Sequence, residues 1–257
     1  MYSYDFEYRL NRLLEKDTFN DFCPNGLLVD STGNPNRKIE KVVTGVSLRE
    51  ALIDEAIGRK ADAIIVHHPN GFWKSEHDKR IVGDNGKYVR MLIKAGIDLY
   101  GYHLPLDAHP LVGNNAQIYK MLGFGDPTHA HRFMEDNIGY VGSGTITEDI
   151  LEATFYHGFQ CLGKPLDLSR GHKIAICSGS GTSGLQYAYD IGCDVFITGE
   201  VRESTPIFAE EHDMTVLAAG HHRSEVFCVS ALSHEINTND SAFPGVTAEF
   251  IDIDNPI

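Results

Sequence analysis

Hydrophobic positions along the chain follow two different periods, which alternate from segment to segment. Phe6, Leu10, Leu13 and Leu14 recur at helical spacing, and a Pro-Asn-Gly break at 24–26 ends that first helix. Continuous apolar runs then alternate with helical patterns. The predicted strands are 41–47, 61–68 and 97–103, and the predicted helices between them are 48–60 and 85–96. This order predicts a parallel sheet with helices packed on it.

The second half of the chain again alternates predicted strands with predicted helices. Short alternating stretches begin near Gly139, and residues 172–200 have the pattern of a strand, a glycine-rich turn, a helix and a strand. Residues 214–222 form a predicted strand that leads into a helix, and 242–256 end the chain with an edge strand. The fold class is therefore α/β. We expect two related domains with mostly parallel sheets, one formed by 1–127 plus 214–257 and the other by 128–213.

The segment GYHLPLDAHP at 101–110 places two histidines, an aspartate and two prolines within ten residues. Pro105 and Pro110 lack a backbone N–H and have a fixed φ. The segment is therefore predicted to be a rigid, irregular loop and not a helix.

Composition and charge exclude several classes of protein. The 257 residues are 42% hydrophobic and 23% charged, which is typical of a globular protein with a real core. A net charge of -14 without a Lys/Arg run disfavours nucleic acid and anionic membrane surfaces as partners. Five cysteines without a CxxC pair indicate reduced thiols and a cytoplasmic location. The chain has neither a signal-peptide pattern nor an apolar run near the ~18 residues of a membrane span.

Three of the predicted strands end in histidines, at the edge where parallel sheets bind ligands. One such histidine is more often solvated or hydrogen-bonded than a ligand, but three such ends favour a metal site. Imidazole with carboxylate suits Zn, Fe, Ni or Mn, and the number of donors suits two adjacent ions. Two donors of the third strand end are four residues apart, on one face of a predicted helix start. The candidate ligands are His67, His68, His103, Asp107, His221 and Glu225.

Those residues also carry a family resemblance. The chain resembles the two-metal family known as type 2 GTP cyclohydrolase I, or NGG-one-interacting-factor-three-like, over nearly its whole length. The matching stretches, in order, are PNGLLV near the start, the histidine pair at 67–68, YGYHLPLDAHPLVGNN at 100–115, TGEVRE at 198–203 and GHHRSE at 220–225. The resemblance implies a cytoplasmic protein of two related α/β domains that forms a toroidal homohexamer. It also implies two divalent metal ions per subunit, facing the internal cavity.

The resemblance assigns ligands position by position. The family's double histidine matches His67 and His68, its H-x-x-x-D pair matches His103 and Asp107, and its G-H-x-x-x-E pair matches His221 and Glu225. Many members have other residues where this chain has His109 and His222, so we expect these two to lie behind the ligands or to line the cavity. The mixed nitrogen and oxygen donors leave the metal open among Fe, Zn, Mn and Ni.

Gly179, Gly181 and Gly184 form a G-x-G-x-x-G that follows a predicted strand and opens a helix, with Glu200 after the next strand. This is the local context of a dinucleotide-binding turn. Two other interpretations stay open, a close-packing turn and a contact to a phosphate group. Glu200 is then a candidate catalytic acid in the cavity, and His222 is the second catalytic candidate.

Three functions are compatible with these patterns. The first is a hydrolase that uses metal-activated water, which for the family's reaction would open the guanine ring of GTP, releasing formate and dihydroneopterin triphosphate. Its partner would be a small molecule, with a nucleotide as one candidate. The second is a non-enzymatic, metal-containing assembly or regulatory protein. The third is an NAD-dependent oxidoreductase built on the glycine turn. For a two-metal centre, Glu225 and Asp107 are the candidate bridging ligands.

Overall fold

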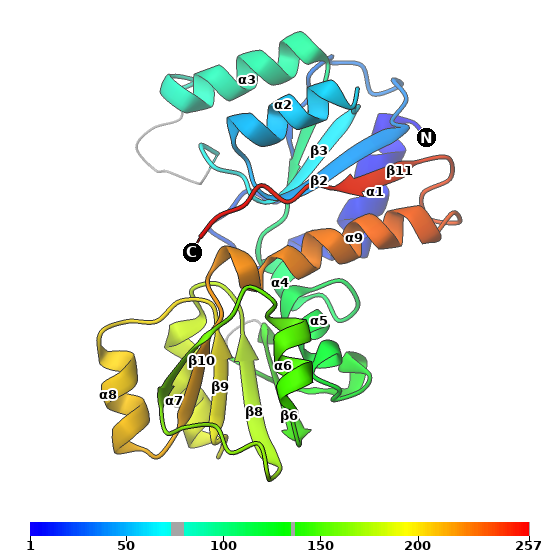
Figure 1. The fold of residues 1–257 in the computed structure, drawn as a ribbon. Helices are drawn as coiled ribbons and strands as arrows, with labels where there is room; N and C mark the ends of the chain where they lie inside the picture. Colours follow the sequence, from blue (N-terminus) through cyan, green and yellow to red (C-terminus); the bar gives the residue numbers. More distant parts are fainter. Residues whose placement is uncertain (73–79, 135–136, 257) are drawn as a thin grey trace. The chain divides into compact units, whose positions relative to one another are not determined.

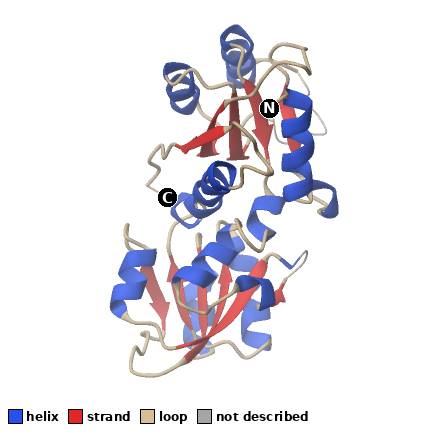
Figure 2. Cartoon of the chain, turned by 90° about the vertical axis from the view of Figure 1, so that its right-hand side faces the viewer, coloured by secondary structure: helices blue, strands red, loops and turns tan. Residues whose placement is uncertain are grey.

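The computed structural model describes residues 1–72, 80–134 and 137–256. The chain divides into two compact units. The first contains 1–106 and 228–254, and the second contains 107–227 and 255–257. In each unit, helices flank a sheet (Figures 1 and 2). The α/β class predicted from the periods is therefore present in both halves.

The first unit contains a five-stranded sheet in the order β1-β4-β3-β2-β11. The central strands β4, β3, β2 and the edge strand β11 are parallel, whereas β1 pairs antiparallel with β4. The predicted parallel core and the closing edge strand are thus confirmed. The strands are β1 (Gly26–Val29), β2 (Lys41–Ser47), β3 (Ala63–His68), β4 (Asp98–Gly101) and β11 (Thr247–Phe250).

Helices cover both faces of this sheet, with α2 and α3 on one side and α1 and α9 on the other (Figure 1). On the α2 and α3 side, Leu52 and Leu92 pack with Val43 in one buried cluster. On the other side, the ring of Phe6 meets Tyr100 edge-on at 5.5 Å. Burial on both faces explains why β2 and β3 are continuous apolar runs. The helical segments are α1 (Ser3–Leu13), η1 (Lys16–Thr18), α2 (Glu50–Gly58), α3 (Gly83–Ala95) and α9 (Val226–Thr238).

The second unit contains a six-stranded sheet in the order β5-β6-β8-β9-β10-β7. Here β8, β9 and β10 are parallel, and the other pairings are antiparallel. The predicted strand, glycine turn, helix and strand of 172–200 correspond to β8, α7 and β9. The strands are β5 (His131–Phe133), β6 (Gly139–Gly144), β7 (Gln160–Gly163), β8 (His172–Cys177), β9 (Val195–Thr198) and β10 (Thr215–Ala218).

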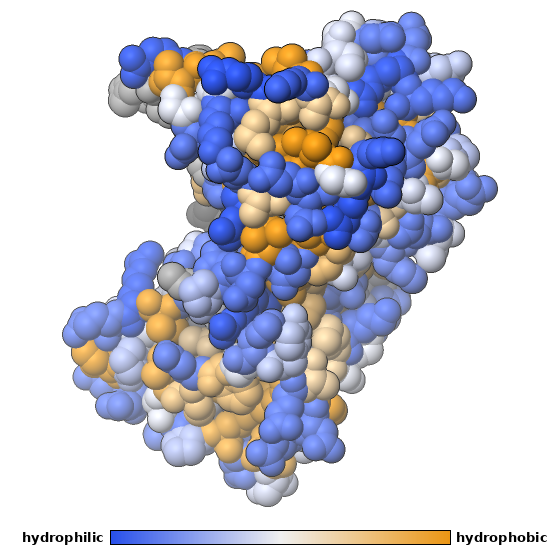
Figure 3. All heavy atoms as spheres, turned by 45° about the horizontal axis from the view of Figure 1, so that its top comes forward, coloured by the Kyte–Doolittle hydropathy of each residue, from blue (hydrophilic) through white to orange (hydrophobic). Residues whose placement is uncertain are grey.

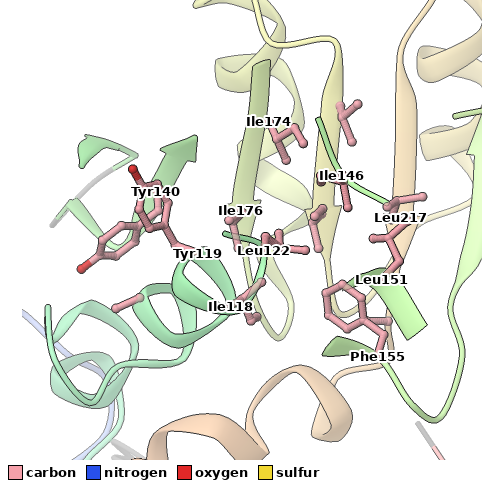
Figure 4. Packing of buried hydrophobic residues seen from close by; sticks show 14 residues of the cluster. Ile118, Tyr119, Leu122, Tyr140, Ile146, Leu151, Phe155, Ile174, Ile176 and Leu217 are labelled. Carbon is pink, nitrogen blue, oxygen red and sulfur yellow. The ribbon is translucent and has the colours of Figure 1, made fainter. Parts of the chain in front are cut away.

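Helices also cover both faces of the second sheet, α5 and α6 on one side and α7 and α8 on the other (Figure 1). Figure 4 shows Ile118 of α5, and Leu122 directly after this helix, packed toward Ile176 of β8. Truncating such a buried aliphatic side chain to alanine costs about 2–5 kcal/mol. The helical segments are α5 (Asn114–Met121), η2 (Pro127–His129), α6 (Glu148–Thr154), η4 (Gly181–Ser183), α7 (Gly184–Asp190), α8 (Ser204–Glu211) and η5 (His222–Ser224).

The unit boundaries differ from the predicted domains of 1–127 plus 214–257 and 128–213. Helix α5 was placed with the first domain, but its buried side chains belong to the core of the second sheet. Strand β10 was also placed with the first domain, but it pairs with β9 and β7. Side-chain packing decides the first assignment and strand pairing the second, and local periodicity reports neither.

The prediction of an irregular loop at 101–110 is wrong for part of that segment. Residues Leu104–Ala108 form the short helix α4. Pro105 is the second residue of this helix, where its missing N–H would have had no helical acceptor, so proline is tolerated there. Pro110 follows the helix, at a position where proline commonly ends one.

In the part of the chain that the structure describes, no helix is long and apolar enough to cross a membrane. On the face shown in Figure 3, hydrophilic residues predominate and hydrophobic ones are interspersed. None of the five cysteines is in a disulfide, and only Cys161 is exposed.

Candidate metal centre

Three imidazoles converge in the first unit. His67 and His68 end β3, and His103 follows β4, its parallel neighbour in the sheet. One nitrogen of each ring lies within 4.8 Å of those of the other two. The ring centroids of His67 and His68 are 4.5 Å apart, and those of His67 and His103 are 5.1 Å apart. Adjacent parallel strands therefore gather the first predicted donors.

The Nδ1 atom of each of these rings already has a hydrogen-bonding neighbour. For His67 it is the carbonyl oxygen of Tyr102 at 3.1 Å, and for His103 it is a carboxylate oxygen of Asp21 at 3.0 Å. Both oxygens only accept, so Nδ1 carries a hydrogen, and in a neutral ring Nε2 then has the lone pair. His68 Nδ1 lies 3.2 Å from the hydroxyl of Ser47. Metal-binding histidines typically hold their second nitrogen in this way, so the cluster fits a metal ion.

Asp21, which the sequence patterns did not single out, supports His103. Its carboxylate also accepts from the backbone N–H groups of Cys23 and Leu104, each at 2.9 Å. Burial raises the pKa of Asp21, but the hydrogen bond and attraction to His103, with the two N–H groups, outweigh it and lower the pKa to about 2. The carboxylate is therefore charged at neutral pH.

In the second unit, His221 follows β10 and lies between two carboxylates. Its Nε2 is 3.1 Å from Glu225, and its Nδ1 is 2.7 Å from Glu200. Burial lowers the pKa of His221, but bonding and attraction to Glu225 and then Glu200 raise it to about 9. The predicted pair of His221 and Glu225 thus meets, although 222–224 form a 3-10 turn and α9 begins only after Glu225.

Asp107 completes the second unit's set of donors. Its carboxylate accepts from Asn114 Nδ2 at 3.1 Å, and Ser178 Oγ lies 3.5 Å away. Carboxylate oxygens of Asp107 and Glu225 lie within 4.8 Å of each other, and both residues are buried. Two buried carboxylates at this separation repel unless a cation or proton lies nearby. The arrangement therefore suits a divalent ion.

The glycine-rich turn packs tightly against these donors. A Cβ on Gly179, whose φ is +58°, would lie 2.1 Å from Glu225 Oε1 and 3.3 Å from His221 Nε2. A Cβ on Gly181 would meet Cys177 Sγ at 2.6 Å, and one on Gly184 would meet Met134 Sδ at 2.6 Å. Protein atoms fill the space beside each glycine. These contacts favour the close-packing interpretation over a dinucleotide-binding turn.

The remaining predicted residues have different surroundings. His109 accepts from the backbone N–H groups of Leu111 and Val112 at 3.1 Å, and so caps a turn. His222 is 7% exposed, within the 3-10 turn between His221 and Glu225. Glu200 is half-exposed and, besides bonding His221, lines a cavity of about 620 Å³ in the second unit.

This cavity opens at the carboxyl ends of β9 and β10. Gly199 and Gly220 line it beside Glu200, and Phe159 contributes an apolar side. Arg223 also lines it, with its guanidinium donating to the carbonyl oxygen of His157 at 3.3 Å. The cavity combines a carboxylate, a cation and an apolar surface, which is the usual character of a small-molecule site.

Comparisons with known proteins agree with this architecture. The profile of the Duf34/NIF3 (NGG1p interacting factor 3) family matches residues 1–256. The chain belongs to the NIF3 family. A Haemophilus influenzae member named "GTP cyclohydrolase 1 type 2 homolog" is 38% identical over 265 residues, with 100% of both chains covered. An Escherichia coli protein of the same name is 37% identical over 259 residues, with 98% of both chains covered.

Solved NIF3-like structures share the fold over the full chain. A protein named ybgI, described as of unknown function, superimposes with a TM-score of 0.84 at 36% identity and covers 100% of both chains. TTHA1606 from Thermus thermophilus superimposes with a TM-score of 0.83 at 28% identity, also with full coverage. The family resemblance inferred from the motifs is therefore confirmed.

Three residues behind the donors escaped the sequence patterns: Asp21, Ser47 and Ser224. Ser224 Oγ accepts from the N–H of Gly179 at 2.9 Å and so holds the glycine turn against Glu225. Asp21 lies three residues before the Pro-Asn-Gly break at 24–26, which predicted only the end of the first helix. A polar break between a helix and a buried strand was the available signal, but nothing in it points to His103.

Proposed function

We propose that this protein is a metal-dependent hydrolase whose two donor sets together bind two divalent ions. The observation that carries the proposal is the shared orientation of the first unit's imidazoles. Each has Nδ1 engaged by a neighbour, and one nitrogen of each ring lies within 4.8 Å of those of the other two. Convergence of all six predicted ligands on one centre is part of this proposal.

The two donor sets would have different roles. His67, His68 and His103 would supply neutral nitrogen ligands, and Asp107 and Glu225 would supply negative charge, with Glu225 bridging. When bound, divalent ions lower the pKa of water and polarise a substrate oxygen. Glu200 holds His221 by Nδ1 and stays half-exposed at the cavity, where a carboxylate can take up and return a proton.

The substrate would be an anionic small molecule in the cavity beside Glu200. Arg223 supplies the positive charge that a phosphate group would pair with, and Phe159 supplies an apolar contact for a ring. The naming of the relatives makes GTP the first substrate to test. The reaction would be the hydrolytic opening of the guanine ring, with release of formate.

The test is a metal-reconstitution assay. Protein stripped with chelator is loaded separately with Fe(II), Zn, Mn and Ni, its metal content is measured, and formate is quantified with GTP as substrate. We expect two equivalents of metal per chain and formate release that depends on the ion. Two equivalents without formate from GTP would refute the cyclohydrolase reaction and favour another substrate or the non-enzymatic alternative.

The homohexamer stays a prediction from the family resemblance. Light scattering at micromolar protein should give about six times the 28.5 kDa chain mass. A monomeric mass would contradict it. The oxidoreductase alternative is tested separately by nicotinamide fluorescence, and an unchanged signal on adding protein would dismiss it.

A further inference from the structure

We propose that Asp21 is a positioning residue that holds His103 in the orientation and tautomer needed to bind a metal ion. The inference rests on the proposed metal centre and adds a residue from outside the donor motifs. Asp21 and His103 are 82 residues apart in the sequence and lie in the same unit.

The carboxylate of Asp21 is held on both oxygens. Oδ1 faces His103 Nδ1 at 3.0 Å and the N–H of Cys23 at 2.9 Å. Oδ2 accepts from the N–H of Leu104 at 2.9 Å and from Asn25 Nδ2 at 3.1 Å. The side chain is only 1% exposed. A buried carboxylate with four donors has little freedom to rotate, so the direction of its bond to the imidazole is fixed.

The same loop also holds the backbone and ring face of His103. Its N–H donates to Asn25 Oδ1 at 2.8 Å. The ring of Phe22 meets the imidazole edge-on, with centroids 4.9 Å apart. Residues 21–25 therefore constrain the position of His103 independently of any ion. The orientation of the imidazole ring is therefore set by contacts within the first unit and does not require a bound metal ion.

Of the three clustered imidazoles, His103 has a carboxylate at Nδ1. His67 faces a backbone carbonyl and His68 faces a neutral hydroxyl. A charged acceptor makes the shorter and stronger hydrogen bond and increases the basicity of the opposite nitrogen. His103 should therefore bind its ion more strongly than a histidine with a neutral partner.

The experiment uses full-length Asp21→Asn. An amide cannot satisfy all four donors, because placing its oxygen toward Oδ1's donors puts its NH₂ against Leu104 and Asn25. In the other orientation, NH₂ faces His103 and reverses its tautomer. We expect Mn²⁺ or Zn²⁺ titration to show about 10–100-fold weaker binding of one ion. Nitrogen NMR of metal-free protein should show His103 with Nδ1–H in the wild type and a shift toward Nε2–H in the variant.

Asn25→Ala is the control. It removes the loop's bond to the His103 backbone and one of the four donors to Asp21, but it leaves the Asp21 carboxylate facing Nδ1. It should lower thermal stability and keep the Nδ1–H tautomer. Comparable affinity losses in both variants with an unchanged tautomer would overturn the proposal, since the loop would then act only as a structural support. So would an Nε2–H tautomer in the wild type, a measurement that needs no variant to fold. Wild-type protein that binds no metal would instead refute the metal centre itself.

Discussion

The two units differ in the kind of candidate metal ligands that they bring together. The first unit gathers three imidazoles that can approach one another without charge repulsion, and neighbours fix their orientation. The second unit gathers carboxylates, and its one imidazole lies between Glu200 and Glu225. A proton on His221 therefore compensates charge in the metal-free protein, consistent with its pKa of about 9. The first unit therefore fixes the orientation of its imidazole ligands, and the second unit provides negatively charged ligands.

This difference predicts which residues matter most for metal affinity. A neutral imidazole is one of several equivalent donors, whereas a buried carboxylate can contact two ions and neutralise part of their charge. Loss of a second-unit carboxylate should therefore affect both ions. Loss of one first-unit imidazole should mainly affect one.

The largest effect is expected for Glu225→Gln. This change keeps the shape of the side chain but removes its charge and weakens the bridging donor, so the content of both ions should fall well below two equivalents per chain. His68→Ala should deplete mainly one. Elemental analysis measures the metal content of each variant, and a thermal melt measures its stability. We expect both variants to stay folded, because the hydrophobic core of each unit lies away from these residues. A Glu225→Gln protein with two full equivalents would show that the bridge is another group.

A substitution in the glycine-rich turn tests how firmly the second unit holds the carboxylate of Glu225 in place. Gly179→Ala places a methyl group 2.1 Å from Glu225 Oε1 at a φ of +58°. It should cost about 2–5 kcal/mol in the free energy of unfolding and reduce metal content. Gly192→Ala is the matched control, because its φ is +77° but nothing lies within 4 Å of the added carbon. The control should cost about 1–2 kcal/mol in urea unfolding. Equal costs would show that Glu225 moves aside freely.

The smallest effects on metal affinity are expected when a residue that hydrogen-bonds a single imidazole is replaced. Comparing two such substitutions shows whether a charged neighbour matters more than a neutral one. Glu200→Gln removes the charged acceptor 2.7 Å from His221 Nδ1 and should weaken one ion's binding about tenfold. Ser47→Ala removes only the hydroxyl 3.2 Å from His68 Nδ1 and should weaken metal binding by a smaller factor. Metal titration of the two variants checks the order. A larger loss for Ser47→Ala would contradict the view that charge dominates in the second unit.

Much of the candidate site could be predicted because its donors follow strands. The apolar run of β3 ends in His67 and His68, and the run of β4 leads into His103, so two parallel strands bring the three to one edge. The pairing of His221 with Glu225 was also predicted, although a 3-10 turn and not a helix brings them together. In a 3-10 turn it is residues three apart that align, so the helical reasoning behind the spacing of four does not account for this contact.

The sequence by itself determined the α/β class, the main strands and the order in which the donors occur, because each follows from local periodicity and from residue types next to one another. Only the tertiary structure decided that β10 and α5 belong to the second unit and that Asp21 lies against His103. It also decided that the glycine turn lies against Glu225. These contacts join segments distant in sequence, and they depend on strand pairing and packing, which leave no period in the sequence to read.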